Sequence, residues 1–178
     1  MEKNRQGLLH IYCGDGKGKT SAAVGLAVRA AGCGMKVLVV RFLKTENSGE
    51  VEVLRSIPGI TVTPCDRTFG FVFRMTDEQK QEAALYYQSR FEAAAEEAVQ
   101  GEYDLLVLDE ILASCNYGMV RETSVVEFLK NRPGKLEVVL TGRNPSETFL
   151  ELADYVSEIR MRRHPYEKGI PARRGIEF

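Results

Sequence analysis

The sequence lacks the features that mark a membrane-bound or nucleic-acid-binding protein. No apolar run approaches the roughly 20 residues that a membrane span needs. The first residues, MEKNRQG, are polar, and no signal-peptide core follows them. The net charge is only −1, so the molecule as a whole has no field that attracts nucleic acid or an anionic membrane. We therefore expect a cytoplasmic protein with neither partner.

Cysteine is scarce and scattered along the chain. Cys13, Cys33, Cys65 and Cys115 form no C-x-x-C pair, and no histidine stands beside them at metal-ligand spacing. This pattern predicts four reduced thiols packed as small hydrophobic side chains. It also argues against a zinc or iron–sulfur site.

Repeats, low-complexity tracts and Pro/Ser-rich linkers are absent too, and 178 residues suffice for one domain. Apolar strand-like runs alternate instead with helical patterns. Strands are predicted at 8–13, 36–42, 60–64, 103–110, 135–142 and 155–161, and helices at about 19–33, from 76 to 101, in pieces over 111–131, and from about 144. This alternation predicts an α/β fold with a mostly parallel central sheet flanked by helices. We expect a single domain over 1–178, with 1–7 a polar extension and 162–178 an irregular tail.

Two helices carry clear signals. The first is predicted to bury one face made of Val24, Ala27, Val28 and Ala31. The longest begins at Thr76, which has capping-box spacing to Gln79, and stops at Gly101. Its apolar face is predicted to hold Ala84, Tyr87, Phe91, Ala94, Ala95 and Ala98.

The stretch CGDGKGKTS, residues 13–21, approximates the phosphate-loop pattern G-x-x-x-x-G-K-[ST]. Cys13 occupies the first glycine position, which leaves Gly14 and Gly16 to supply unusual backbone angles. Backbone N–H groups from Gly16 to Lys19 can form an anion nest at the start of a helix. Lys19 adds a cation, and the next hydroxyl can bind magnesium. The predicted ATP-binding residues are Gly14, Asp15, Gly16, Lys17, Gly18, Lys19, Thr20, Ser21 and Arg143, although a solvated turn is an equal alternative for Lys17 and a plain surface position for Arg143.

A second acidic element follows the buried strand in YDLLVLDE. Asp109 and Glu110 end that strand, where open α/β sheets bind ligands. We therefore predict that Thr20, Asp109 and Glu110 hold a magnesium or manganese ion. Two alternatives stay open, since these carboxylates could cap the following helix or, as in ATPases, the second could activate water.

An NKxD motif is absent, which argues against a GTPase. The residues alone leave a P-loop ATPase, a small-molecule kinase and a non-catalytic ATP-binding regulatory module. Further stretches, GDGKGKT, VVRFLK, YDLLVLDE, VVLTGRNP, LADYVSEIR and HPYEKGIPARRGIEF, run in order from about 7 to 178. Together they resemble the ATP:corrinoid adenosyltransferases of the CobA/BtuR type.

The resemblance implies a P-loop fold of RecA-like type, a homodimer, and transfer of the 5′-deoxyadenosyl group of ATP to Co(I) of a corrinoid, with release of triphosphate. Lys19 would then act catalytically by stabilising charge on the leaving oxygen. The family loop usually reads GNGKGKT, so Asp15 departs from it and either weakens phosphate binding or turns outward and caps the loop.

An aromatic pair is the other family feature, thought to displace the lower axial ligand of Co(II) corrinoid. Phe71 and Phe73 stand at its place, on one side of the chain if that segment is extended; core packing is the alternative for each. Lys44, like Arg143, could reach a phosphate or pair with Glu110. The basic tail could be a solvated face, bind the corrinoid's nucleotide tail, or dock a flavodoxin-like or other reductase.

Overall fold

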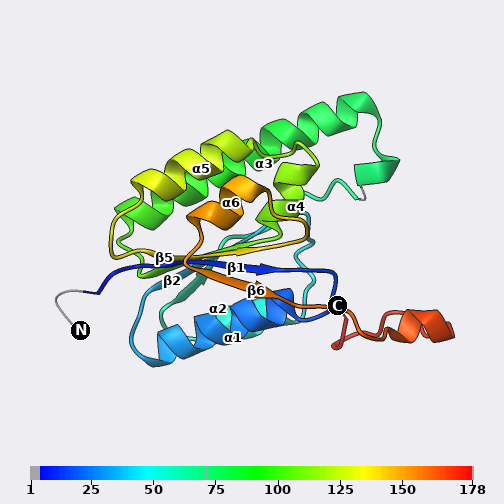
Figure 1. The fold of residues 1–178 in the computed structure, drawn as a ribbon, viewed down its shortest axis with the longest axis horizontal. Helices are drawn as coiled ribbons and strands as arrows, with labels where there is room; N and C mark the ends of the chain where they lie inside the picture. Colours follow the sequence, from blue (N-terminus) through cyan, green and yellow to red (C-terminus); the bar gives the residue numbers. More distant parts are fainter. Residues whose placement is uncertain (1–4, 71, 178) are drawn as a thin grey trace.

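The computed structural model describes residues 5–70 and 72–177, and one parallel sheet runs through the middle of it (Figure 1). Six strands pair in the order β3-β2-β4-β5-β1-β6, and every neighbouring pair is parallel. Their bounds are β1 (Leu9–Cys13), β2 (Val37–Arg41), β3 (Ile60–Val62), β4 (Leu105–Asp109), β5 (Glu137–Thr141) and β6 (Tyr155–Glu158). The predicted strands are confirmed, with ends shifted by a few residues.

Helices cover both faces of this sheet (Figure 1). On one face lie α1 (Lys19–Gly32) and α2 (Glu50–Ser56); on the other lie α3 (Asp77–Gln100), α4 (Ile111–Asn116), α5 (Glu122–Asn131) and α6 (Glu147–Leu152). Two short 3-10 turns complete the described elements, η1 (Val72–Arg74) and η2 (Pro165–Lys168). This arrangement confirms the α/β prediction and is consistent with a single-domain P-loop-like fold. The one unpredicted helix, α2, buries only Val51 and Leu54, which is too short a pattern to read from sequence.

The first helix buries part of the predicted face, since Ala27 is fully buried and Val24 and Ala31 pack partly buried against the core. Ala23, Ala27 and Ala30 lie against the sheet, whereas Val28 is 42% exposed. The prediction for Val28 is therefore wrong. Alanines spaced by four and three residues form one stripe on a helix, and their small side chains let the α1 backbone lie close to the sheet.

The long helix α3 follows its predicted pattern. Both hydrogen bonds of the capping box form between Thr76 and Gln79, and Tyr87 and Phe91 lie in the core. The same face also buries Arg90, whose guanidinium donates to the carbonyl oxygens of Arg41, Thr63 and Pro64. This arginine ties α3 to the segments that follow β2 and β3.

All four cysteines are free thiols. Cys13 is buried and Cys65 and Cys115 are partly buried, but Cys33 is exposed, so the packing prediction is wrong for Cys33. Cys33 is the C-cap residue of α1, just before the turn at Gly34 that leads into β2. Within the described residues, no helix is long and apolar enough to cross a membrane.

Candidate nucleotide and metal site

The candidate site lies at the carboxyl edge of the sheet. Because all strands are parallel, the segments that leave β1, β2, β4 and β5 emerge at this one edge. β5 lies between β1 and β4 in the sheet. Even so, Thr20 at the start of α1 donates a hydrogen bond to Asp109 at the end of β4. The sequence predicted both elements; the sheet order brings them together.

The loop between β1 and α1 depends on its glycines. Gly14 and Gly18 have φ of 105° and 121°, which L side chains rarely adopt. A Cβ atom on Gly14 or Gly16 would lie 2.4 or 2.7 Å from the carbonyl oxygen of Ile159. Glycine is therefore required here both for backbone angle and for close passage of the segment after β6.

One predicted phosphate contact is not available. The N–H of Gly16 donates to the Ile159 carbonyl at 2.8 Å, so the anion nest predicted from Gly16 onward can begin only at Lys17. The contact arises because the chain after β6 crosses this loop. The N–H groups that open α1 have no acceptor within the helix, as at every helix start, and point out of its N-terminus.

Lys19 is held inside the loop. Lys19 is only 7% exposed, and its Nζ donates to the carbonyl oxygen of Gly16 at 2.8 Å. Burial lowers the pKa of this ammonium, and the nearby Arg143 charge lowers it further, against the opposing pull of Glu110. By contrast, the side chains of Lys17 and Ser21, which were also predicted to bind ATP, are exposed.

Asp109 is the centre of a hydrogen-bond network. It is 2% exposed, and Oδ1 accepts from the hydroxyls of Thr20 at 3.0 Å and Thr141 at 2.6 Å. The Thr141 hydroxyl also accepts from the N–H of Glu110 at 2.8 Å. Thr141 thus fixes both the carboxylate of Asp109 and the backbone that follows it.

Lys44 reaches into the same network from the end of β2. Its Nζ donates to the Thr20 hydroxyl at 2.8 Å and also to Oδ2 of Asp109. The preceding residue, Leu43, has φ of 52°. This left-handed conformation is uncommon for a bulky side chain, and the chain bends there. An ammonium group therefore contacts two of the three groups predicted to bind metal, Thr20 and Asp109.

The residues present fit a magnesium or manganese ion. A hydroxyl and a carboxylate are the hard oxygen ligands that these ions prefer, and a cation already binds both of them. Across residues 5–70 and 72–177 there is no group of three His, Cys, Asp or Glu side chains that could hold a metal. Thr20 and Asp109 would therefore supply only part of a coordination shell, and phosphate oxygens and water the rest.

Glu110 joins this network only through its backbone N–H, and within the described residues its carboxylate makes no hydrogen bond to Thr20, Asp109 or Lys44. It takes the N-cap position of α4 with φ of 62°, and its carboxylate makes no cap hydrogen bond, so the helix-cap alternative is wrong for it. The side chain lines an open pocket of about 540 Å³, together with Lys44, Arg143 and Tyr117. Burial, followed by the charge of Asp109, raises the pKa of Glu110.

Arg143 is exposed on the rim of that pocket. Among the ion pairs that the described residues form, none joins Arg143 to Glu110. Its backbone carbonyl instead accepts from the amide of Asn116 at 2.9 Å, which ties the β5–α6 connection to α4. The guanidinium acts electrostatically on Glu110, Lys19 and Asp15.

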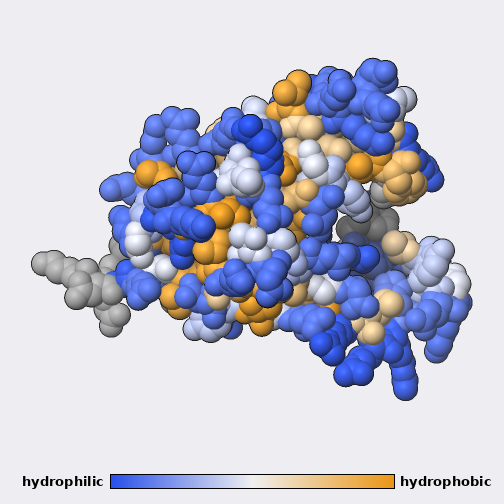
Figure 2. Space-filling view, turned by 45° about the horizontal axis from the view of Figure 1, so that its top comes forward, coloured by the Kyte–Doolittle hydropathy of each residue, from blue (hydrophilic) through white to orange (hydrophobic). Residues whose placement is uncertain are grey.

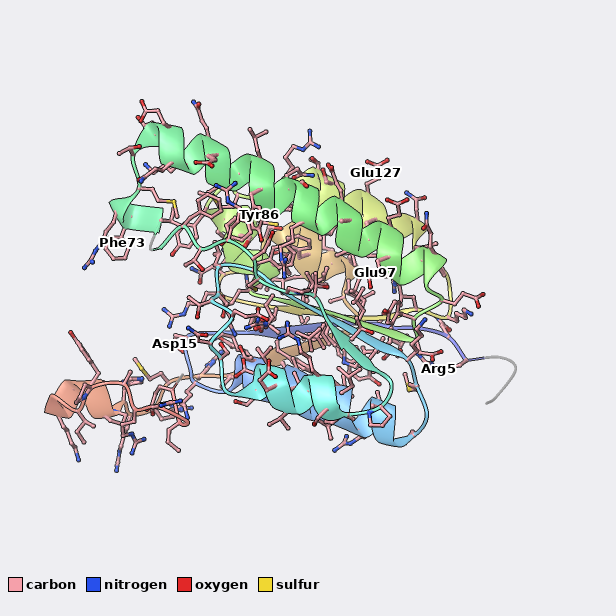
Figure 3. The ribbon with its side chains drawn as sticks, turned by 180° about the vertical axis from the view of Figure 1, so that it is seen from behind. Arg5, Asp15, Phe73, Tyr86, Glu97 and Glu127 are labelled. Carbon is pink, nitrogen blue, oxygen red and sulfur yellow. The ribbon has the colours of Figure 1, made fainter. Side chains whose placement is uncertain are left out.

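Asp15 turns outward from the loop. Its carboxylate accepts from the N–H of Met161 at 2.9 Å, which holds the pKa of Asp15 below its ordinary value. Of the two consequences expected from this departure from the family loop, the structure supports the second. The carboxylate attaches the tail to the loop rather than pointing into it (Figure 3).

The turn η1, which carries Phe73, projects from the same end of the sheet, on the α3 side (Figures 1 and 3). Phe71 lies outside the described residues. Phe73 is 78% exposed, so the core-packing alternative is wrong for it. Residues 72–74 form the 3-10 turn η1, so this part of the segment is not extended, which was the condition for placing the aromatic pair on one side of the chain. Phe69, four residues before Phe73, packs inward against Tyr86 and Tyr87.

The tail projects from this end too, on the α1 side (Figure 1). Hydrophilic side chains dominate its surface (Figure 2). Part of its positive charge is paired locally, since Arg160 contacts Glu158 and Arg173 contacts Glu177. The tail and η1 therefore stand on opposite sides of the candidate site.

Sequence analysis missed Thr141, and it suggested a phosphate or Glu110 as the partner of Lys44, whereas the structure pairs the Lys44 ammonium with Asp109 and Thr20. Thr141 is the last residue of β5, at the same edge as Asp109. The signal available in the sequence was a polar residue directly after the apolar run VVL of this strand. For Lys44 the sequence offered only its place after the strand VLVVR.

Fold and site together define an α/β protein of the P-loop-like class, with a hydroxyl–carboxylate pair beside its glycine loop. Residues 5–178 match the family described as ATP:corrinoid adenosyltransferase BtuR/CobO/CobP. The chain belongs to this family.

Curated relatives agree. The chain is 33% identical to the corrinoid adenosyltransferase of Pseudomonas aeruginosa, over 99% of this chain and 86% of that protein. It is also 33% identical to the corrinoid adenosyltransferase of Escherichia coli K12, over 99% and 88%. It is 32% identical to the corrinoid adenosyltransferase CobA of Salmonella typhimurium, over 99% of this chain and 88% of that protein.

Proposed function

We propose that this protein transfers the 5′-deoxyadenosyl group of ATP to Co(I) of a corrinoid and releases inorganic triphosphate. The observation that carries the proposal is the convergence of Lys19, Thr20 and Asp109 at one sheet edge, in a chain that matches an adenosyltransferase family over almost its whole length.

The chemistry is a displacement at carbon. The electron pair of Co(I) forms the cobalt–carbon bond, the bond from the ribose 5′-carbon to its bridging oxygen breaks, and that oxygen leaves with the triphosphate. The nucleophile carries no proton, so no general base is needed. What the protein must supply is stabilisation of the negative charge on the leaving oxygens, which is commonly the largest catalytic contribution.

The residues of the loop are suited to that task. The N–H groups at the start of α1 and the ammonium of Lys19 present positive charge to a polyphosphate. Lys19 gives up its contact with the Gly16 carbonyl at little cost, because one acceptor replaces another. Thr20 and Asp109 would hold magnesium or manganese, which when bound adds charge stabilisation at the phosphates.

We propose Phe73 as the aromatic that contacts the corrinoid. What supports this role is its exposure on a projecting turn, since a large exposed aromatic is the kind of side chain that partners and ligands cover. The exposed basic tail supports the further proposal of an acidic electron donor, such as a flavodoxin-like reductase. The proposal of a homodimer rests on the resemblance to the family.

One observation favours ATP hydrolysis as a second candidate. Glu110 is partly buried next to Asp109 and has a raised pKa, and a carboxylate in this state can take a proton from water. Hydrolysis, however, would break the bond between phosphates rather than the bond to carbon.

Product analysis separates the two. The protein is incubated without oxygen with ATP, magnesium and chemically reduced corrinoid, while the visible spectrum is followed for a light-sensitive cobalt–carbon bond and phosphates are separated by ion exchange. Adenosyl transfer yields intact triphosphate in proportion to that bond. Production of ADP and phosphate without the new bond would overturn the proposal.

A further inference from the structure

We infer that Lys44 is a resident cation of the metal site: its ammonium occupies the position between Thr20 and Asp109 while the site holds no nucleotide, and a divalent metal must displace it to bind. This inference rests on the proposed role of Thr20 and Asp109 as metal ligands. It assigns to Lys44 a positioning role, which none of the sequence patterns gave it.

Lys44 is the counter-cation of the buried Asp109 carboxylate. This carboxylate is almost fully buried, and both of its oxygens accept hydrogen bonds from side chains. Of these donors only Lys44 carries a charge. A buried carboxylate without a counter-cation is strongly destabilising, so the folded, nucleotide-free protein needs a cation at Oδ2.

The geometry of the ammonium places it where a metal would bind. Nζ binds the Thr20 hydroxyl and Oδ2 of Asp109 at the same time, which are the two oxygens that a metal would use. The Lys44 ammonium and a divalent metal ion bound to the same oxygens would repel each other strongly, even at an effective dielectric constant of 20. Lys44 and a divalent ion therefore cannot share this position.

The displaced Lys44 ammonium has a pocket beside it to move into. Lys44 also lines the pocket that contains Glu110 and Arg143. Glu110 is the carboxylate there, and the positive charge of Lys44 already acts on it. Rotation about the four-carbon side chain brings Nζ into this pocket, next to Glu110, without movement of β2.

The consequence is a metal site that opens only when phosphates arrive. Thr20 and Asp109 offer too few ligands to compete with the tethered ammonium on their own. Triphosphate supplies the missing oxygens for the metal and the negative charge that draws Lys44 away. The free protein should therefore bind divalent metal weakly.

Manganese binding to the nucleotide-free protein tests this. Mn²⁺ is titrated into wild type and Lys44→Met, and free Mn²⁺ is measured by electron paramagnetic resonance. Loss of the ammonium should tighten binding at least ~10-fold, given the repulsion it removes, whereas Lys44→Arg, which keeps the charge, should show no gain. Lys17→Met removes a charge from the neighbouring loop without touching Asp109 and should change the affinity by less than about twofold.

Two further variants keep the test decisive. Lys44→Met leaves Asp109 without its cation, so Lys44→Gln, whose amide still donates to a carboxylate, is measured alongside it with the same expectation. Adding Asp109→Asn to either variant should abolish the gain. Unchanged or weaker binding in both Lys44 variants, an equal gain in Lys17→Met, or a gain that survives Asp109→Asn would each overturn the inference. The titration contains neither ATP nor corrinoid, so its result is independent of whether adenosyl transfer is observed.

Discussion

Replacing Thr141 with valine tests the central network of the site. Thr141 is fully buried at the end of β5. Its hydroxyl donates to Asp109 and accepts from the backbone of Glu110. Valine has nearly the same shape, so the substitution removes the two hydrogen bonds while leaving the surrounding packing in place.

The expected cost follows from these two contacts. A hydrogen bond to a charged group contributes about 1.5–3 kcal/mol, and a buried N–H left without an acceptor costs about 1–3 kcal/mol. The two share one hydroxyl and do not add fully, so we expect the free energy of unfolding to fall by about 2–4 kcal/mol. For a chain of this length, this corresponds to a fall in Tm of about 5–15 °C.

Thermal and urea unfolding of the nucleotide-free protein, followed by circular dichroism, measure this cost. Thr141→Ser is the matched control, because it keeps the hydroxyl and loses only one methyl group, which costs about 0.5–1.5 kcal/mol in a core. The reasoning is refuted if Thr141→Val lies within about 0.5 kcal/mol of wild type, or if serine destabilises as much as valine.

Three other predictions concern chemistry. Lys19→Ala should reduce adenosyl transfer by ~10²–10³, the usual effect of removing one charge-stabilising donor; near-normal turnover, measured from the visible spectrum of the product, would contradict the role of Lys19. Phe73→Ala should slow the reaction that starts from Co(II) corrinoid far more than the one that starts from chemically prepared Co(I), and equal losses would reduce Phe73 to a general binding contact. At pH 8, iodoacetamide should modify exposed Cys33 but not Cys115, because burial raises the pKa of Cys115 to about 12 and so keeps the thiol protonated up to a pH well above its usual range. Peptide mass spectrometry measures this difference, and comparable labelling of the two cysteines would show that Cys115 is accessible in solution.

Local patterns predicted most of the elements correctly. Capping residues and stop signals act within a few positions along the chain, so Thr76, Gln79 and Gly101 marked the ends of α3 reliably. Uninterrupted apolar runs likewise indicated strands covered on both faces, and β2 and β4 are buried along their whole length. The buried face of α1 was less certain, because alanine and valine both pass as apolar and only the sheet decides which stripe packs.

Site residues were predictable in proportion to how much of their chemistry is local. The glycine loop, Lys19 and Thr20 form one continuous motif, and Asp109 stands at the end of a readable strand. Sequence alone could not show that Asp15 binds the tail, because its partner, Met161, lies 146 residues away. For Phe73, it could not distinguish an exposed turn from a core position.

The sequence by itself determined the alternation of strands and helices, the glycine loop, and the presence of a carboxylate after a buried strand, because each depends on residues close together in the chain. Only the tertiary structure decided which strands are neighbours, and therefore that Thr20, Lys44, Asp109 and Thr141 meet at one point. These four side chains come from four segments far apart in the chain (the start of α1, the loop after β2, and the ends of β4 and β5), and parallel pairing of β1, β2, β4 and β5 brings them to a common edge. Contacts between residues this far apart in the chain arise from packing of the whole sheet, which no local pattern encodes.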